Sequence, residues 1–189
     1  MKIYPKIKRL GDIALAISIL LFLLPMYLLL ALIIWLQDGG PAIFKQRRVG
    51  RNGQEFMFYK FRSMPVSTPN VESRETQKLQ ITPFGKFIRR TNLDELPQIY
   101  NVLRGDMSFI GPRPPICSQK ELIEMRRANG ALAIQPGLTG WAQVNAYDRM
   151  PPEQKAAFDG EYADRFSINI DLLILVKTVG YFFKKPPTY

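Results

Sequence analysis

Two adjacent carboxylates, Asp94 and Glu95, are the side chains in this sequence best suited to chemistry. We predict a helix over 94–104, with Asp94 as its N-cap and Gly105 as its stop. Free N–H groups at a helix start attract anions, but two carboxylates would repel a phosphate unless a divalent cation such as Mg²⁺ neutralised them. Acidic residues are also common as simple caps, so this segment alone leaves a purely structural role open.

Cationic and amide side chains in three other segments change that balance. Lys60 and Arg62 alternate with apolar residues, and Arg113 stands in the stiff, proline-rich turn 111–115. Arg89 precedes Asp94 by five residues, where it would neutralise phosphoryl charge. The glycine-containing loop 136–145 adds amides such as Gln143, which are suited to binding a base or a sugar. Together these segments predict a cationic cleft around a carboxylate nucleophile. No Walker A or G-x-G-x-x-G pattern is present.

The composition excludes several other chemistries. Histidine is absent, so a Ser-His-Asp triad and a His-ligated metal cannot be built. One cysteine allows no internal disulfide. The 189 residues carry 26 Lys and Arg against 16 Asp and Glu, a formal charge of +10. This charge favours an anionic partner: a nucleic acid, an anionic membrane surface or a phosphorylated substrate.

The N-terminal segment favours the membrane. Residues 13–36 form 24 consecutive uncharged positions, about 36 Å as a helix against about 30 Å for a bilayer core. Pro25 near the middle predicts a kink or a break. Basic residues flank the segment on both sides, and positive flanks mark the cytoplasmic face. A re-entrant, kinked helical hairpin that enters and leaves on one face satisfies both flanks, whereas a simple span does not. We therefore predict a membrane anchor over 1–38.

Residues 39–189 are predicted to form one small cytoplasmic α+β domain. Two short strands, 41–48 and 54–61, flank an Asn-Gly pair typical of a β-hairpin. The polar segment 66–80 is predicted to be a loop. Helices are predicted over 82–90, 119–128, 152–166 and 171–185, the first with Thr82 as cap and the last either interfacial or an ordinary core helix.

Four motifs in order resemble one known family. They are Lys-Phe-Arg-Ser-Met at 60–64, Leu-Asp-Glu-Leu-Pro-Gln at 93–98, Gly-Asp-Met-Ser-Phe-Ile-Gly-Pro-Arg-Pro at 105–114 and Pro-Gly-Leu-Thr-Gly-Trp-Ala-Gln-Val-Asn at 136–145. The chain is similar to the bacterial sugar transferases, the monotopic phosphoglycosyl transferases, over about 8–177. Its short length resembles the minimal members.

The resemblance implies a reaction and a place. Such enzymes move a phospho-sugar from a UDP-sugar to polyprenyl phosphate at the cytoplasmic face of the bacterial inner membrane, and they need Mg²⁺. The match implies that Asp94 is the nucleophile, that Glu95 is its acidic partner and that the two hold the metal. It also implies that Lys60, Arg89 and Arg113 lie at the cleft. The expected partners are the UDP-sugar, polyprenyl phosphate and membrane lipids, with no nucleic acid.

Two departures from the family pattern bear on these expectations. Leucine stands before Pro25 where many relatives have serine, so no hydroxyl satisfies a carbonyl freed at the kink. Many relatives also continue the fourth motif with Gly-Arg and carry an arginine before its Pro-Gly, whereas this chain has Ala146-Tyr147 and Gln135. If those arginines contact the donor, donor recognition differs here.

A membrane-anchored polybasic adaptor that binds anionic lipids is the main alternative function. It explains the charge and the apolar segment but not the order of the motifs. A nucleic-acid-binding module explains only the charge. The transferred sugar and the oligomeric state stay open, with a homo-oligomer among the alternatives.

Overall fold

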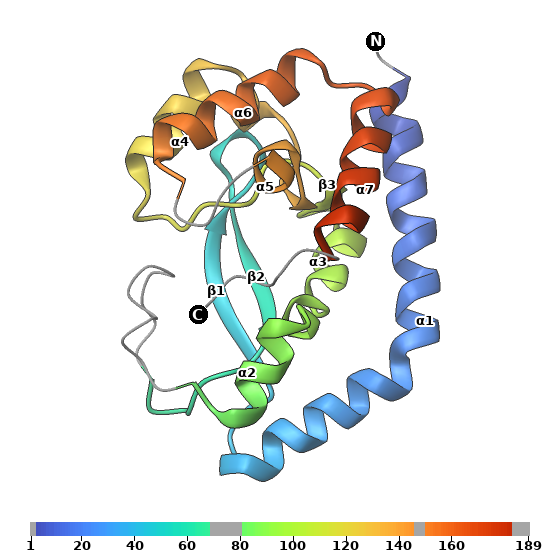
Figure 1. The fold of residues 1–189 in the computed structure, drawn as a ribbon, viewed down its shortest axis with the longest axis vertical. Helices are drawn as coiled ribbons and strands as arrows, with labels where there is room; N and C mark the ends of the chain where they lie inside the picture. The colour runs from blue at the N-terminus through green and yellow to red at the C-terminus, as the bar shows by residue number, and fades with distance from the viewer. Residues whose placement is uncertain (1–2, 69–80, 146–149, 183–189) are drawn as a thin grey trace.

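The computed structural model of the chain describes residues 3–68, 81–145 and 150–182. It has mixed helix and sheet, as predicted, with a long apolar N-terminal helix set against a small domain (Figure 1). In chain order the elements are α1 Tyr4–Asp38, β1 Ile43–Val49, the short 3₁₀ turn η1 Arg51–Gly53, β2 Glu55–Phe61, α2 Pro83–Arg90, η3 Leu93–Glu95, α3 Gln98–Arg104, β3 Ser108–Ile110, α4 Lys120–Ala128, η4 Ala131–Ala133, β4 Gly137–Thr139, α5 Trp141–Asn145, α6 Pro152–Asp164 and α7 Ile168–Phe182.

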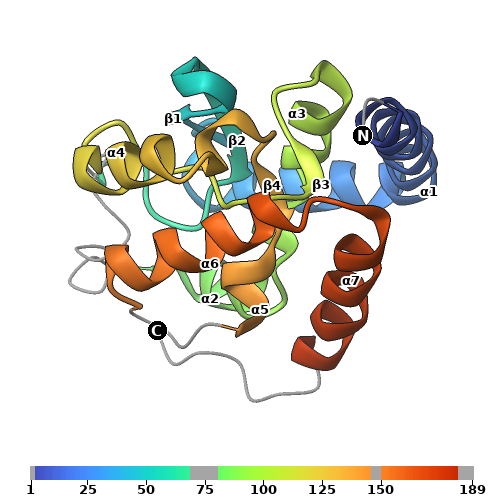
Figure 2. The same cartoon turned by 90° about the horizontal axis from the view of Figure 1, so that it is seen from above.

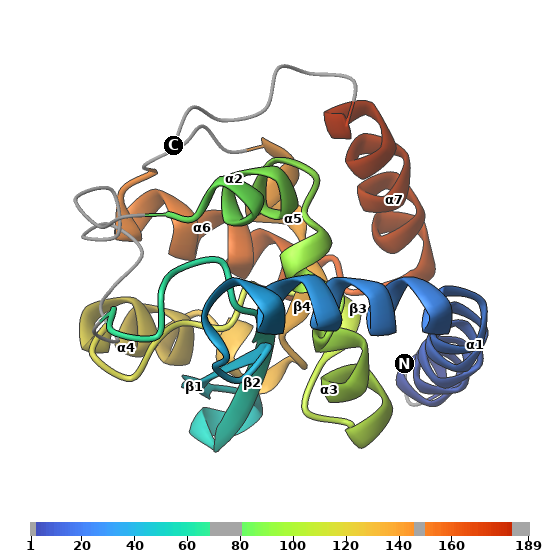
Figure 3. The same ribbon diagram turned by 90° about the horizontal axis from the view of Figure 1, so that it is seen from below.

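Helix α1 is one continuous helix that bends near its middle (Figure 1). Seen from below, its first arm is viewed nearly end-on and its second arm lengthwise (Figure 3). The helix runs through Pro25, which removes one hydrogen bond and crowds the preceding turn. The predicted kink is thus confirmed, whereas the two arms do not fold back on each other. Whether α1 enters and leaves a bilayer on one face stays a prediction.

Both arms of α1 pack on the domain while most of the helix surface stays exposed. Ala16 of the first arm is buried against Phe58 and Val102, and Leu30 and Ile34 of the second arm join a second core cluster. The most apolar 18-residue stretch has a mean hydropathy of 2.8, yet only 11% of it is buried. An ordinary core helix would be mostly buried. α1 is therefore long and apolar enough to cross a membrane, and its exposed apolar surface is consistent with membrane anchoring.

The predicted hairpin is confirmed. Strands β1 and β2 pair antiparallel in the register Ile43 opposite Phe61 and Val49 opposite Glu55. Asn52 and Gly53 both have positive φ, which asparagine and glycine adopt at the lowest cost. The turn residues therefore allow the chain to reverse and place the two strands side by side.

A second, two-stranded parallel sheet was not predicted. Strand β3 pairs with β4, with Ser108 opposite Gly137 and Ile110 opposite Thr139. The backbones approach so closely that a Cβ atom on Gly111 would lie 2.2 Å from the Gln135 carbonyl oxygen. This contact brings the third and fourth sequence motifs together.

Helix boundaries were predicted with mixed success. Helix α2 has the predicted cap, because the Thr82 hydroxyl accepts from the Gly85 N–H at 2.9 Å. Helix α3 ends at Gly105 as predicted, with a φ of 90° there. Helix α4 matches its prediction within one residue, α6 ends two residues early and α7 starts three residues early. Most of the predicted loop 66–80, the departure at 146–147 and the end of the last helix lie outside the described residues.

The predicted helix start at Asp94 is wrong. Asp94 lies in the separate turn η3, Asn92 before it is left-handed with a φ of 55°, and α3 begins only at Gln98. Proline at 97 has no N–H to donate to the Leu93 carbonyl, so that carbonyl accepts from the Leu96 N–H at 3.3 Å instead. The chain therefore makes a 3₁₀ turn at the acidic pair and starts the α-helix after Pro97.

Candidate active site

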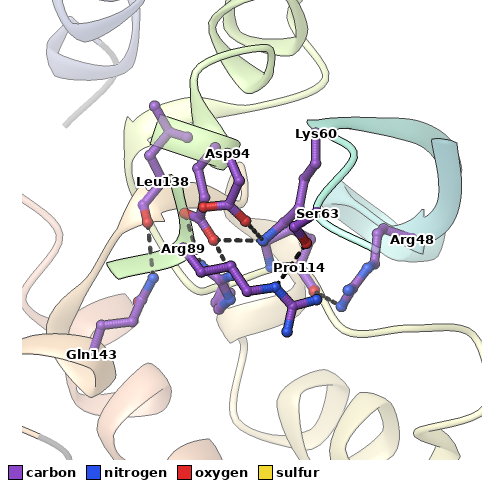
Figure 4. Close-up of polar contacts among 10 residues, drawn as sticks. Arg48, Lys60, Ser63, Arg89, Asp94, Pro114, Leu138 and Gln143 are labelled. Atoms are coloured by element: carbon purple, nitrogen blue, oxygen red, sulfur yellow. Dashed lines mark hydrogen bonds and ion pairs between the residues drawn. The ribbon is translucent and has the colours of Figure 1, made fainter. Parts of the chain in front are cut away.

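The acidic pair sits in a cluster of cations supplied by distant segments. Lys60 at the end of β2 places its ammonium 2.8 Å from Glu95 Oε1 and 3.4 Å from Asp94 Oδ2 (Figure 4). Arg113 donates two hydrogen bonds to Glu95, from Nη2 to Oε1 at 2.5 Å and from Nη1 to Oε2 at 3.3 Å. A fork of two N–H donors on one carboxylate is the strongest form of such a pair. The structure thus brings together four of the predicted residues: Asp94, Glu95, Lys60 and Arg113.

The two carboxylates differ in electrostatic environment. Burial raises the pKa of Asp94, and the attraction of Lys60 offsets this only in part. Burial acts in the same direction on Glu95, but Arg113 and Lys60 outweigh it and hold the pKa of Glu95 well below its ordinary range. Glu95 is therefore held as an anion paired with Arg113 and Lys60, while the Asp94 carboxylate has the higher pKa of the two.

Arg89 lies at the same site and is oriented by a serine. Its Nε donates to the Ser63 hydroxyl at 2.7 Å, and its charge stabilises the Asp94 carboxylate (Figure 4). Ser63 belongs to the first motif, and its backbone carbonyl packs against Gly85 so closely that a Cβ there would lie 2.0 Å away. The first motif is thus fixed to the start of α2, the helix that carries Arg89 in its last turn.

Arg62 and Gln143 are engaged elsewhere. Arg62 follows the last residue of β2 and binds both carboxylate oxygens of Asp38 at the end of α1, at 2.5 and 2.6 Å. Gln143 donates to the Leu138 carbonyl at 3.1 Å, and its buried Oε1 has no hydrogen-bond partner among the described residues (Figure 4). Arg62 thus ties α1 to the hairpin, and the predicted substrate role of both residues stays a prediction.

The backbone of the loop that carries Arg113 is held by residues that the sequence analysis did not predict as part of the site. Arg126 of α4 donates to the Arg113 carbonyl at 2.9 Å and makes two contacts, 2.8 and 2.5 Å, with Oδ2 of the buried Asp159 of α6. Arg48 of β1 donates to the Pro114 carbonyl at 3.1 Å. These contacts fix the backbone from which the Arg113 side chain reaches Glu95. The residues stand far from the motifs, so spacing along the chain gave no signal.

The second arm of α1 contacts the backbone of the acidic turn. The Tyr27 hydroxyl donates to the Leu96 carbonyl, next to Glu95. Leu30 and Ile34 share a core cluster with Phe61 and Ile88, and Leu93 and Leu96 pack against it. The apolar helix therefore lies directly against the turn that presents the two carboxylates.

The comparisons with known proteins assign the chain to a family. Residues 3–185 match the family model of the bacterial sugar transferases, and the chain belongs to that family. It is 39% identical over 182 residues to the UDP-glucose:undecaprenyl-phosphate glucose-1-phosphate transferase of Xanthomonas campestris pv. campestris, covering 90% of this chain and 37% of that protein. It is 36% identical over 203 residues to the undecaprenyl-phosphate galactose phosphotransferase of Salmonella typhimurium, covering 97% and 42%.

A shorter relative matches over most of its length. The uncharacterized sugar transferase EpsL of Bacillus subtilis is 37% identical over 173 residues, which cover 92% of this chain and 85% of EpsL. By contrast, this chain spans only about two fifths of the length of the two transferases whose names state a reaction. The names of those two relatives differ in the sugar, glucose in one and galactose in the other.

Proposed function

We propose that this chain is a phosphoglycosyl transferase that moves a phospho-sugar from a UDP-sugar to polyprenyl phosphate and initiates a bacterial glycan pathway. The observation that supports this best is the unequal acidic pair. Asp94 is buried, which raises the pKa of its carboxyl group. The charge of Glu95 beside it is neutralised by Lys60 and Arg113. Covalent catalysis by a carboxylate needs no histidine, in agreement with a sequence that has none.

In the first step Asp94 is the nucleophile. A carboxylate oxygen attacks the β-phosphorus of the donor, the bond from that phosphorus to the bridging oxygen breaks, and UMP leaves with the bridging oxygen. A phospho-sugar ester remains on Asp94. The cations Lys60, Arg89 and Arg113 stabilise the charge on the transferred phosphoryl group. Glu95 holds two of these cations in place.

In the second step polyprenyl phosphate attacks the same phosphorus. A phosphate oxygen of the lipid forms the new diphosphate bond, the bond to Asp94 breaks, and the carboxylate is regenerated. The lipid reaches the site along α1, whose second arm packs against the acidic turn. The product is a polyprenyl-diphosphate-sugar.

The acidic pair suits Mg²⁺ when a diphosphate is also present. Among the described residues no three His, Cys, Asp or Glu side chains gather around one ion position. Mg²⁺ commonly binds through one or two carboxylates plus substrate phosphates, so Asp94 and Glu95 would hold it together with the donor. When bound, the ion neutralises diphosphate charge.

The proposed location is the cytoplasmic face of the bacterial inner membrane, with α1 as a re-entrant anchor. The kink at Pro25, the exposed apolar surface of α1 and the two basic flanks support this arrangement. Both ends of α1 then lie on the side where UDP-sugars are available.

UMP release tests the proposed function. The full chain in detergent is incubated with Mg²⁺, polyprenyl phosphate and a panel of UDP-sugars, and UMP is measured. We expect release from at least one donor, dependent on Asp94. A membrane-anchored polybasic adaptor would release none, and that result would overturn the proposal.

A further inference from the structure

A surplus of positive charge surrounds the loop that carries Arg113. Six cations and three carboxylates of the described residues form one connected group. The cations are Arg48, Lys60, Arg89, Arg113, Arg126 and Lys155, and the carboxylates are Asp94, Glu95 and Asp159. Like charges gathered in a partly buried place repel each other, so this group favours a bound anion.

Lys155 is the member of this group that serves neither the proposed reaction nor the support of the Arg113 loop. It lies on α6, one helical turn before Asp159 and therefore on the same face of the helix. Asp159 attracts the ammonium of Lys155 but offsets the repulsion from the arginines only in part. Its Oδ2 accepts two N–H groups of Arg126, and its buried Oδ1 has no hydrogen-bond partner among the described residues. Arg48, Arg113 and Arg126 all repel its ammonium.

The position of this lysine favours a soluble ligand over a lipid. Helix α4 and the start of α6 lie on the opposite side of the domain from α1 in two perpendicular views (Figures 1 and 2). The polyprenyl phosphate is expected from the α1 side. A ligand that binds from the α4 and α6 side would therefore not compete with the lipid for the α1 side.

We propose that Lys155 is a phosphate-binding residue that holds the nucleotide phosphate of the donor, next to Arg113. The inference rests on the proposed function, because it assigns Lys155 to one part of the UDP-sugar donor, the nucleotide phosphate. Lys60, Arg89 and Arg113 then face the transferred phosphoryl group, while Lys155 faces the phosphate that leaves. Negative charge grows on the leaving phosphate as its bond to the β-phosphorus breaks, so a cation there favours the transition state.

The pH dependence of phosphate affinity distinguishes a phosphate-binding Lys155 from a Lys155 with only a structural role. Burial and the repulsion from Arg126, Arg113 and Arg48, offset in part by Asp159, lower the pKa of Lys155 to about 8. A lysine that binds phosphate only when charged then loses affinity as the pH rises through that value. Arginine at the same position stays protonated, because its pKa is above about 12.

Binding of UMP and of uridine to the full chain in detergent, measured by calorimetry, tests the proposal. We expect Lys155→Met to weaken UMP binding about tenfold and to leave uridine binding unchanged, since one charge-assisted hydrogen bond to phosphate is lost. Between pH 7 and 9 we expect UMP affinity to fall in the wild type but not in Lys155→Arg. Lys120→Met, which removes the same charge from an exposed position on α4, is the matched control.

Three results would overturn the proposal. Unchanged UMP binding in Lys155→Met shows that the ammonium does not bind the phosphate. An equal loss for UMP and uridine shows a structural role. A raised KM for polyprenyl phosphate with normal UMP binding assigns the lysine to the acceptor. Failure of the proposed function would give a different result. A protein that binds UMP through Lys155 but releases no UMP from any donor would support the phosphate site and contradict the proposed reaction.

Discussion

Replacing Arg126 by methionine tests whether Arg126 positions the backbone of the Arg113 loop. Arg126 and Asp159 are 2% and 1% exposed and form a buried ion pair, and Arg126 also donates to the Arg113 carbonyl. Removing one partner of a buried pair leaves the other charge uncompensated, which costs about 3–5 kcal/mol. For a chain of this length that corresponds to a Tm lower by about 6–20 °C.

A double variant separates stability from positioning. Arg126→Met combined with Asp159→Leu replaces the pair by apolar side chains, and such replacements are often neutral for stability. We expect its Tm to return close to the wild-type value. The Arg113 carbonyl still lacks its donor, so the loop is held only by contacts such as Arg48 to Pro114. We expect kcat/KM for UMP release to stay about tenfold low, or about 1.4 kcal/mol in the barrier.

The assays are thermal unfolding in detergent and UMP release at saturating polyprenyl phosphate. Arg127→Met is the matched control, because Arg127 lies on the same helix with its side chain 60% exposed and pairs with an equally exposed Glu124. We expect it to change stability by less than about 0.5 kcal/mol. Full activity in the double variant would show that Arg113 keeps its position without Arg126. The proposed positioning role of Arg126 would then be wrong.

Three further predictions address the proposed mechanism, metal and topology. Asp94→Asn should abolish turnover and the phospho-sugar adduct seen by intact-protein mass spectrometry with donor alone, whereas Glu95→Gln should reduce turnover while leaving the nucleophile in place. An adduct on Asp94→Asn would refute the assignment of the nucleophile. Excess EDTA should abolish UMP release and added Mg²⁺ should restore it; full activity in EDTA would contradict a metal held by the acidic pair. A cysteine added at either chain end, in a Cys117→Ser background, should resist a membrane-impermeant reagent in intact cells, and labelling of one end alone would show a simple span.

Local signals in the sequence predicted the local structure well. The Asn-Gly pair of the hairpin, Thr82 before Pro83 and Gly105 after α3 each act within one turn of the backbone, so adjacent residues suffice to identify them. The error at Asp94 was also local. Acidic residues followed by a proline fit a helix start, and a proline at the third helical position would lose no hydrogen bond. The structure shows a 3₁₀ turn there instead: Asn92 takes a left-handed conformation before the acidic pair, and Pro97 has no N–H to donate to the Leu93 carbonyl, which accepts from the Leu96 N–H.

Contacts between distant segments could not be predicted in the same way. Strands β3 and β4 are three residues each, so neither carries a periodic pattern long enough to detect, and the 26 residues 111–136 separate them along the chain. Arg126 and Asp159 occupy two separate helices, and each looks like an ordinary surface charge in the sequence. Their burial becomes visible only when α4 packs on α6. The motifs contain the acidic pair, Lys60 and Arg113, but not the residues of other elements that contact the Arg113 loop.

The chemistry at the acidic pair follows from these distant contacts rather than from the pair itself. Asp94 and Glu95 are adjacent and carry the same functional group, and two neighbouring carboxylates differ in role only where their environments differ. Among the cations Arg113 contributes most to that difference, because with Lys60 it holds Glu95 as an anion while burial raises the pKa of Asp94. Arg113 in turn depends on β3, β4 and the Arg126–Asp159 pair for its position. The basic carboxylate of Asp94 is therefore a property of the whole domain, and a variant that displaces Arg113 should make the two acids more alike before it unfolds the protein.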